Sequence, residues 1–137
     1  MRLEIIAEVL ASVGLGRIGE SIFVHHMPPE CREGVMVKTP LTGIEICAEL
    51  PGYYRGGLQV IVRAQKHERG EEMAKTVLRA LSTLQRKEYI HPQTRQPEMI
   101  VNQMIPKALP VRYPRSDGNG IEWSINFDCS YVLPAGI

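Results

Sequence analysis

The sequence predicts an α+β fold, in which a mainly antiparallel β-sheet carries two helices packed on one face. Segments 58–66 and 121–133 alternate apolar and polar residues with period two, which is typical of strands that bury one face. Segments 3–13 and 71–87 place apolar residues three and four positions apart, as amphipathic helices do. A sheet buried on both faces would show continuous apolar runs instead, so the helices are expected to cover a single face.

The N-terminal half predicts one helix, two short strands and a long loop. The helix over 3–13 is expected to end at Gly14, because glycine tolerates the left-handed conformation that closes many helices. Short β-branched runs over 21–25 and 34–39 follow, and prolines end both of them. The stretch 41–56 contains glycines and prolines around one apolar patch, and it predicts a long loop with at most a short strand.

The C-terminal half predicts a strand, a helix and a hairpin. The strand over 58–66 leads into the helix, whose first turn carries Glu71 and Glu72 and whose end carries Arg86 and Lys87, an order that suits the helix dipole. Alternating runs over 99–109 and 121–133 are separated by Asp-Gly and Asn-Gly dipeptides, which favour tight hairpin turns. The second run is the clearest strand in the sequence.

Composition narrows the classes of function. The 137 residues suit a single domain, predicted over 1–137, with 44% hydrophobic and 23% charged residues. Sixteen Lys and Arg balance 15 Asp and Glu without a basic run, which argues against DNA binding as the main role. Three widely spaced cysteines indicate reduced thiols in a cytoplasmic setting. Neither a signal peptide nor a membrane span is expected, because the first apolar run contains acids and no long uncharged run exists.

No residue pattern predicts catalysis, a cofactor or a metal. Residues 14–19 spell G-x-G-x-x-G, but a dinucleotide site needs a strand before that motif and a helix after it, and here the order is reversed. His25 and His26 are adjacent on a strand end and point to opposite faces. A zinc site that combines histidines with Cys31 is the alternative, but the absence of ligand spacing favours packed or solvated histidines. Cys129 is in phase with the core residues of its strand and is expected to be buried.

One cluster indicates a protein-binding surface. Tyr53, Tyr54 and Arg55 precede Arg63 and Lys66, which lie on the polar face of the next strand. Tyrosine and arginine are enriched where proteins bind proteins. The alternative interpretation, which composition separates poorly from the first, is a solvated loop followed by a charged strand face.

The order of these segments resembles that of the phage minor capsid and tail-terminator family, the lambda-type tail-completion proteins. The resemblance spans nearly the whole chain and has moderate specificity, since no invariant signature carries it. Its parts are the first helix, Ile22-Phe23-Val24 with the turn Met27-Pro28-Pro29-Glu30, Gly34-Val35-Met36-Val37, the loop to Tyr53-Tyr54-Arg55, residues 58–64 before the long helix, and the final run Asp117-Gly118-Asn119-Gly120 to Phe127.

The resemblance implies a structural virion protein without enzymatic activity. Such a subunit would form a ring, expected to be a homohexamer, that caps the tail tube protein, ends tube polymerisation and meets the head-tail connector. It would be assembled in the host cytoplasm, and DNA would contact it only in passing, which suits a near-neutral chain. Another head-tail completion or neck protein is the second interpretation, and a small enzyme or ligand-binding domain is the third.

The resemblance also directs attention to candidate interface residues. We expect the 41–56 loop to become ordered on the tube or on a neighbouring subunit. The residues predicted to contact a subunit or the tube are Ile44, Ile46, Tyr53, Tyr54, Arg55, Arg63, Lys66 and Arg115.

Overall fold

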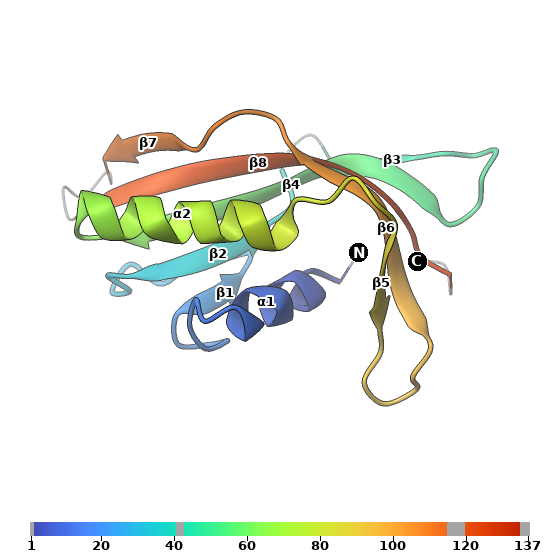
Figure 1. Cartoon of the computed structure of the whole chain (residues 1–137), viewed down its shortest axis with the longest axis horizontal. Helices are drawn as coiled ribbons and strands as arrows, with labels where there is room; N and C mark the ends of the chain where they lie inside the picture. The colour runs from blue at the N-terminus through green and yellow to red at the C-terminus, as the bar shows by residue number, and fades with distance from the viewer. Residues whose placement is uncertain (1, 41–42, 115–119, 135–137) are drawn as a thin grey trace.

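A computed structural model describes residues 2–40, 43–114 and 120–134, and it contains two helices and one mixed sheet (Figure 1). The elements in chain order are α1 (Leu3–Ser12), β1 (Ile22–Val24), β2 (Gly34–Lys38), β3 (Ile44–Ile46), β4 (Tyr53–Ala64), α2 (His67–Leu81), β5 (Lys87–Ile90), β6 (Pro97–Pro106), β7 (Val111–Pro114) and β8 (Ile121–Val132). The predicted α+β class is confirmed.

Two long central strands organise the sheet. β4 and β8 each have 12 residues and pair antiparallel along their whole length, from Tyr53 opposite Val132 to Ala64 opposite Ile121. The strand order is β1-β2-β4-β8-β6-β5. β3 pairs with β4 beyond the end of β2, and β7 pairs with β8 beyond the end of β6. The pairing of β1 with β2 is parallel and all other strand pairs are antiparallel, so the sheet is mainly antiparallel, as predicted.

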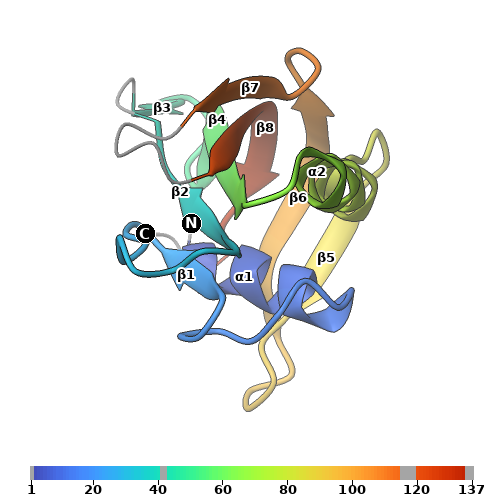
Figure 2. The same cartoon turned by 90° about the vertical axis from the view of Figure 1, so that its left-hand side faces the viewer.

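The hydrophobic core lies between the sheet and the two helices, which both cover the same face (Figure 2). The even-numbered residues of β4 face the odd-numbered residues of β8 across the pairing, as Val60 opposite Ile125 illustrates, and these side chains are buried. α1 adds Ile6 and Leu10 to this core, and α2 adds residues such as Val77. The apolar side chains that recur every two residues in the strands and about every 3.6 residues in the helices therefore pack together in a single core.

The second helix differs from its prediction at both ends. It runs from His67 to Leu81, so Glu71 and Glu72 lie past its first turn, and Arg86 and Lys87 lie outside it. The helix stops because Ser82 is extended and Thr83 exchanges two backbone hydrogen bonds with Met104, at 2.9 and 2.8 Å. The charge order that suits the dipole is still present, with Glu68 in the first turn and Arg79 in the last.

The strand after the long loop also begins earlier than predicted. β4 starts at Tyr53 instead of residue 58, and β3 pairs with its first residues, with Ile44 opposite Gly56. A Cβ atom on Gly56 would lie 3.0 Å from Ile44 Cγ1, and one on Gly57 would lie 2.8 Å from Pro40 Cγ. Two glycines that suggested a loop therefore permit close packing beside a strand.

The predicted strand over 99–109 corresponds to β6, and a further strand that was not predicted, β7, follows it. β6 ends at Pro106, and β7 begins at Val111 and forms the hairpin with β8. The predicted hairpin is therefore wrong in its first strand, because β7 and not β6 directly precedes β8, and the predicted turn over 117–120 falls mostly outside the described residues. Strand β5 follows α2 and was not predicted from the sequence.

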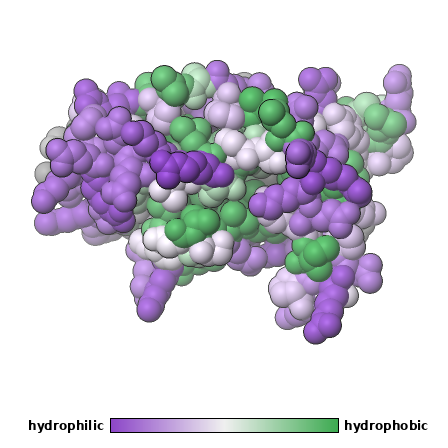
Figure 3. Space-filling model, viewed as in Figure 1, coloured by the Kyte–Doolittle hydropathy of each residue, from purple (hydrophilic) through white to green (hydrophobic). Residues whose placement is uncertain are grey.

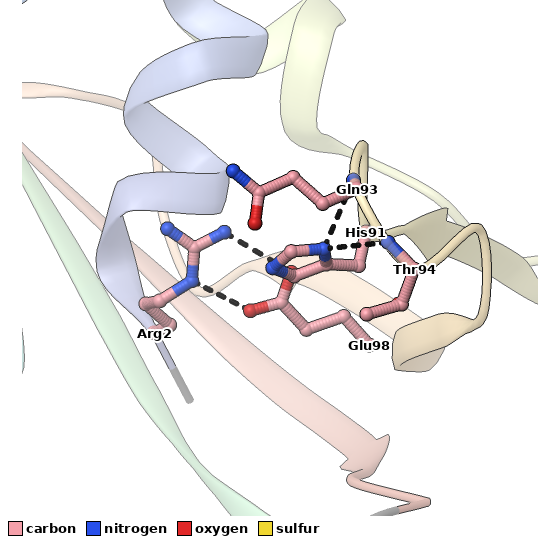
Figure 4. Close-up of polar contacts among 5 residues, drawn as sticks. All are labelled: Arg2, His91, Gln93, Thr94 and Glu98. Atoms are coloured by element: carbon pink, nitrogen blue, oxygen red, sulfur yellow. Dashed lines mark hydrogen bonds and ion pairs between the residues drawn. The ribbon is translucent and has the colours of Figure 1, made fainter.

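A polar contact fastens the start of α1 to the far edge of the sheet (Figure 4). The Nε and Nη2 atoms of Arg2 donate to the two carboxylate oxygens of Glu98 on β6, at 2.6 and 3.0 Å. The Arg2 guanidinium lowers the pKa of Glu98 through this hydrogen bond. Beside it, the Nδ1 atom of His91 accepts hydrogen bonds from the backbone N–H groups of Gln93 and Thr94, which shapes the hairpin between β5 and β6.

Replacement of Gly70 by alanine should destabilise the protein, although alanine favours helices. Gly70 is buried in α2, and a Cβ atom there would overlap the six-membered ring of Trp123. Helix propensity alone would stabilise Gly70→Ala by about 1 kcal/mol, whereas overpacking should cost about 2 kcal/mol. Urea denaturation measures the difference, and Glu72→Ala at an exposed position of the same helix should change stability by less than about 0.5 kcal/mol. A stabilised Gly70→Ala variant would contradict this packing.

The Arg2–Glu98 contact should make stability depend on acid pH. Because the folded state lowers the pKa of Glu98, the ionised carboxylate stabilises the fold above the pKa of the unfolded chain, and this contribution disappears as the pH falls below about 4. Thermal unfolding of the wild type and of Glu98→Gln should therefore differ at pH 7 and converge at low pH. If the difference in melting temperature between the two proteins stays the same from pH 7 to pH 3, ionisation of Glu98 does not contribute to stability.

Candidate interaction surface

The residues predicted to form an interface do not make one continuous surface. Tyr53 lies where β4 begins, and Arg63 lies near the other end of the same 12-residue strand. Ile44 and Ile46 lie on β3, which pairs with the start of β4, so these two residues lie near Tyr53 and far from Arg63. Lys66 is exposed and immediately precedes α2. Arg115, the remaining predicted residue, lies outside the described residues.

The Arg63 side chain is buried and joins separate segments of the chain through its hydrogen bonds. Its exposed fraction is 9%, and its Nε atom donates to Glu122 Oε2 at 2.8 Å. Its Nη1 atom donates to the backbone carbonyls of Pro28, at 2.8 Å, and Cys31, at 3.0 Å. Arg63 thus ties the β1–β2 connection to two central strands. The alternation correctly placed Arg63 on the polar face of β4, but the expectation of a charged residue displayed there is wrong, because the connection covers it.

Tyr54 is also largely internal. It is 7% exposed and packs against Tyr131 of β8, with ring centroids 5.6 Å apart. Its neighbours in sequence differ, since Arg55 is exposed and Tyr53 is half-buried. Of the Tyr-Tyr-Arg run, Arg55 is therefore the residue most available to a partner.

The structure gives the long connection a defined shape, which we call the arm (residues 44–52). β3 runs along the start of β4, and backbone hydrogen bonds from Leu50 to Cys47 and from Tyr53 to Leu50, at 3.2 and 3.0 Å, close the turn between them. The arm projects from the end of the sheet (Figure 1). Ile46 is 68% exposed and Leu50 is 56% exposed, so the arm presents apolar side chains that its own chain does not cover.

The sheet face opposite the helices is polar. Gln59 Nε2 and Asn126 Nδ2 both donate to the Ser124 hydroxyl, at 2.9 and 3.2 Å. Farther along the same face, Lys107 pairs with Asp128 at 3.4 Å. The register also places Lys38, Glu45 and Arg55 on this face, so it combines neutral amides and hydroxyls with charges of both signs.

A second apolar region was missed by sequence reasoning. We call it the α2 groove, and its walls are α2 with residues 82–85 on one side and residues 104–110 on the other. Leu84 is 77% exposed and Leu109 is 84% exposed. The helical spacing assigned Leu84 to the core of a longer helix, and no pattern singled out Leu109.

The groups considered for enzymatic chemistry have structural explanations. Cys129 faces the core, and burial raises the pKa of its thiol to about 12, so the thiolate that a nucleophile needs is disfavoured. The glycines of the G-x-G-x-x-G run have positive φ at Gly14, Gly16 and Gly19, and they form the turn between α1 and β1. A Cβ atom on Gly16 would overlap the Ser21 hydroxyl, which accepts a hydrogen bond from the Arg17 backbone N–H at 3.0 Å.

Within residues 2–40, 43–114 and 120–134, no three His, Cys, Asp or Glu side chains are grouped so that they could hold a metal ion. In the same part of the chain, no helix is both long and apolar enough to cross a membrane.

A family model described as bacteriophage tail terminator protein matches residues 9–133, which extends from the middle of α1 to the residue after β8. A search of curated proteins found no match.

Loss of the Arg63 side chain should destabilise the fold strongly. Arg63→Met would leave the Glu122 carboxylate and two backbone carbonyls without their donor, at a cost of about 3 kcal/mol. Arg55→Met is the matched control, because Arg55 is an exposed arginine on the same strand and face, and it should cost less than about 0.5 kcal/mol. Equal urea midpoints for the two variants would show that the Arg63 contacts do not stabilise the protein.

Proposed function

The chain belongs to the bacteriophage tail terminator family, and from that premise we propose that it is the subunit of a ring that caps the tail tube, ends its polymerisation and joins it to the head connector. The family is one of structural proteins of the phage tail, so the role is assembly and not catalysis. The match over residues 9–133 carries the proposal, because it includes all eight strands, the whole of α2 and the last turn of α1.

The distribution of apolar side chains supports ring formation. A ring of identical subunits needs head-to-tail contacts, in which two different surface patches meet, whereas a two-fold dimer needs one self-complementary patch. The arm and the α2 groove are two distinct apolar regions on one chain. We propose a homohexamer, in which each subunit uses one region toward each neighbour.

The polar sheet face suits the passage of DNA through such a ring. Each phosphate bound by a lysine or arginine adds affinity that would slow the moving DNA. The chain has a formal net charge of +1, and Gln59, Ser124 and Asn126 on this face are neutral and hydrogen-bonded to one another. If this face lines the channel, contact with DNA stays transient.

The proposed partners are other copies of the chain, the tail tube protein and the head-tail connector. Assembly would take place in the host cytoplasm, and the finished protein would reside in the virion at the head-tail junction. Arg55, together with the exposed residues of the arm, is a proposed contact with a neighbour or with the tube.

Deletion of the gene from its phage should produce tails of abnormal length. Without a cap, tube subunits continue to add, so electron microscopy of lysates should show overlong tails that lack heads, and expression of the wild-type chain in the host should restore normal tails. Tails of normal length that fail to join heads would instead assign the chain to another neck role. Purified protein should also form rings by negative stain.

A further inference from the structure

We propose that, in the ring, the arm of each subunit packs into the α2 groove of its neighbour. The occupant of the groove is therefore a second copy of this chain. This inference rests on the proposed ring and specifies which two surfaces meet in it.

The exposure of apolar side chains points to these two regions. Among the described residues, five large apolar side chains are more than half exposed, namely Ile46, Leu50, Leu84, Leu109 and Val111. The first two lie on the arm, the next two on the walls of the groove, and Val111 directly after one wall. Figure 3 shows apolar groups at the surface above α2 and again on the projecting arm. Exposed apolar side chains that cluster in this way mark interaction sites, whereas single scattered ones are common on any protein surface.

The α2 groove has the shape that an extended apolar segment requires. It consists of two hollows between the same pair of chain segments, one of about 300 Å³ beside α2 and one of about 540 Å³ beyond the helix end. Leu78 lines the first hollow and Ser82, one turn later, lines the second. Pro106 and Leu109 continue the opposite wall from one hollow to the other. The two hollows are therefore neighbours, one beside α2 and one beyond its end.

Charge complementarity identifies the arm as the occupant. The arm carries Glu45 and Glu49, and both are exposed. Lys75, which lines the groove, and Arg79, one turn later on α2, are exposed too. Among the described residues, none of these four has an ion-pair partner. Glu49 lies beside Leu50 in the turn of the arm, while Glu45 lies opposite Arg55 on the other face of β3 from Ile46. Glu71 also lines the groove but pairs with His67, so Lys75 and Arg79 are the cations available to the carboxylates of the arm.

The two kinds of contact have different consequences. Ion pairs at an exposed rim add little affinity and are screened by salt, but they select the partner and its orientation. Burial of the leucines and isoleucine contributes most of the binding. The interface should therefore be specific and moderately salt-sensitive.

The two regions lie on different strands of one chain, which suits a contact between subunits. The arm lies beside the start of β4, whereas the groove is lined by α2 and by β6 with the segment that follows it. β8 separates β4 from β6 in the sheet. Ile46 and Leu50 of the arm and Leu84 and Leu109 of the groove are all exposed in the single chain, so each copy offers one arm and one free groove, and such heterologous contacts close into a ring when the rotation permits.

Charge reversal tests the pairing. The arm variant Glu45→Lys with Glu49→Lys, and the groove variant Lys75→Glu with Arg79→Glu, should each raise the protein concentration needed for half-maximal ring formation at least tenfold, measured by mass photometry. Combination of all four substitutions should bring this concentration back to within about threefold of the wild type. Glu20→Lys with Glu30→Lys is the matched control, because it changes the same charge at exposed sites elsewhere and should have little effect.

A cross-link provides a second measurement. The arm contains Cys47, so Leu109→Cys should let a short bismaleimide join neighbouring subunits into a ladder of oligomers, and the further change Cys47→Ser should abolish the ladder. Rings that form normally in both charge variants, with no cross-link through Cys47, would overturn the arm-groove pairing and leave the proposed function intact. A wild-type chain that never forms rings, alone or on tail tubes, would overturn both.

Discussion

The pairing of β4 with β8 along 12 residues is the constraint on which the rest of the structure depends. It fixes which residues of both strands face the helices, because a shift of one position would turn every side chain to the opposite face. Leu58, Val60 and Val62 meet Phe127, Ile125 and Trp123 on the core side. The same register places Arg63 against Glu122 and Gln59 beside Ser124 on the other side. The hydrophobic core, the Arg63–Glu122 contact and the polar face therefore all follow from the register between β4 and β8.

The long central pair also explains where the surface features lie. β2 and β3 share one edge of β4, and β6 and β7 share the opposite edge of β8. On the β8 edge, β6 ends at Pro106 and β7 begins at Val111, so residues 107–110 lie outside the sheet there. The connection that follows β6 becomes a wall of the α2 groove, and the hairpin that β3 begins becomes the arm. Both proposed contact regions are therefore consequences of two strands that are longer than their neighbours.

Sequence periodicity predicted the parts of the fold that bury one face. The alternation over 121–133 gave β8 nearly to the residue, and the spacing over 3–13 gave α1. The end of α2 could not be predicted, because Leu84 continues the helical spacing and only the bridge between Thr83 and Met104 interrupts it. Gly56 and Gly57 suggested a loop, since the close approach of Ile44 and Pro40 is a tertiary property. The candidate interface was predicted in part: the apolar patch of the arm was visible, but Arg63 was expected on an open surface and the groove had no sequence signal.

The proposed interface explains how subunits could remain apart in solution and form a ring only at the end of the tail tube. The exposed leucines of the groove, Leu84 and Leu109, lie outside the hydrophobic core of the single chain. Each arm-groove contact is small and rimmed by four charges, and it should be weak between two free subunits. Closure changes this balance, because a subunit in a closed ring is held by two contacts and the second forms at a high effective concentration. A tail tube that gathers subunits at its end would therefore favour the ring there, while dilute subunits remain apart.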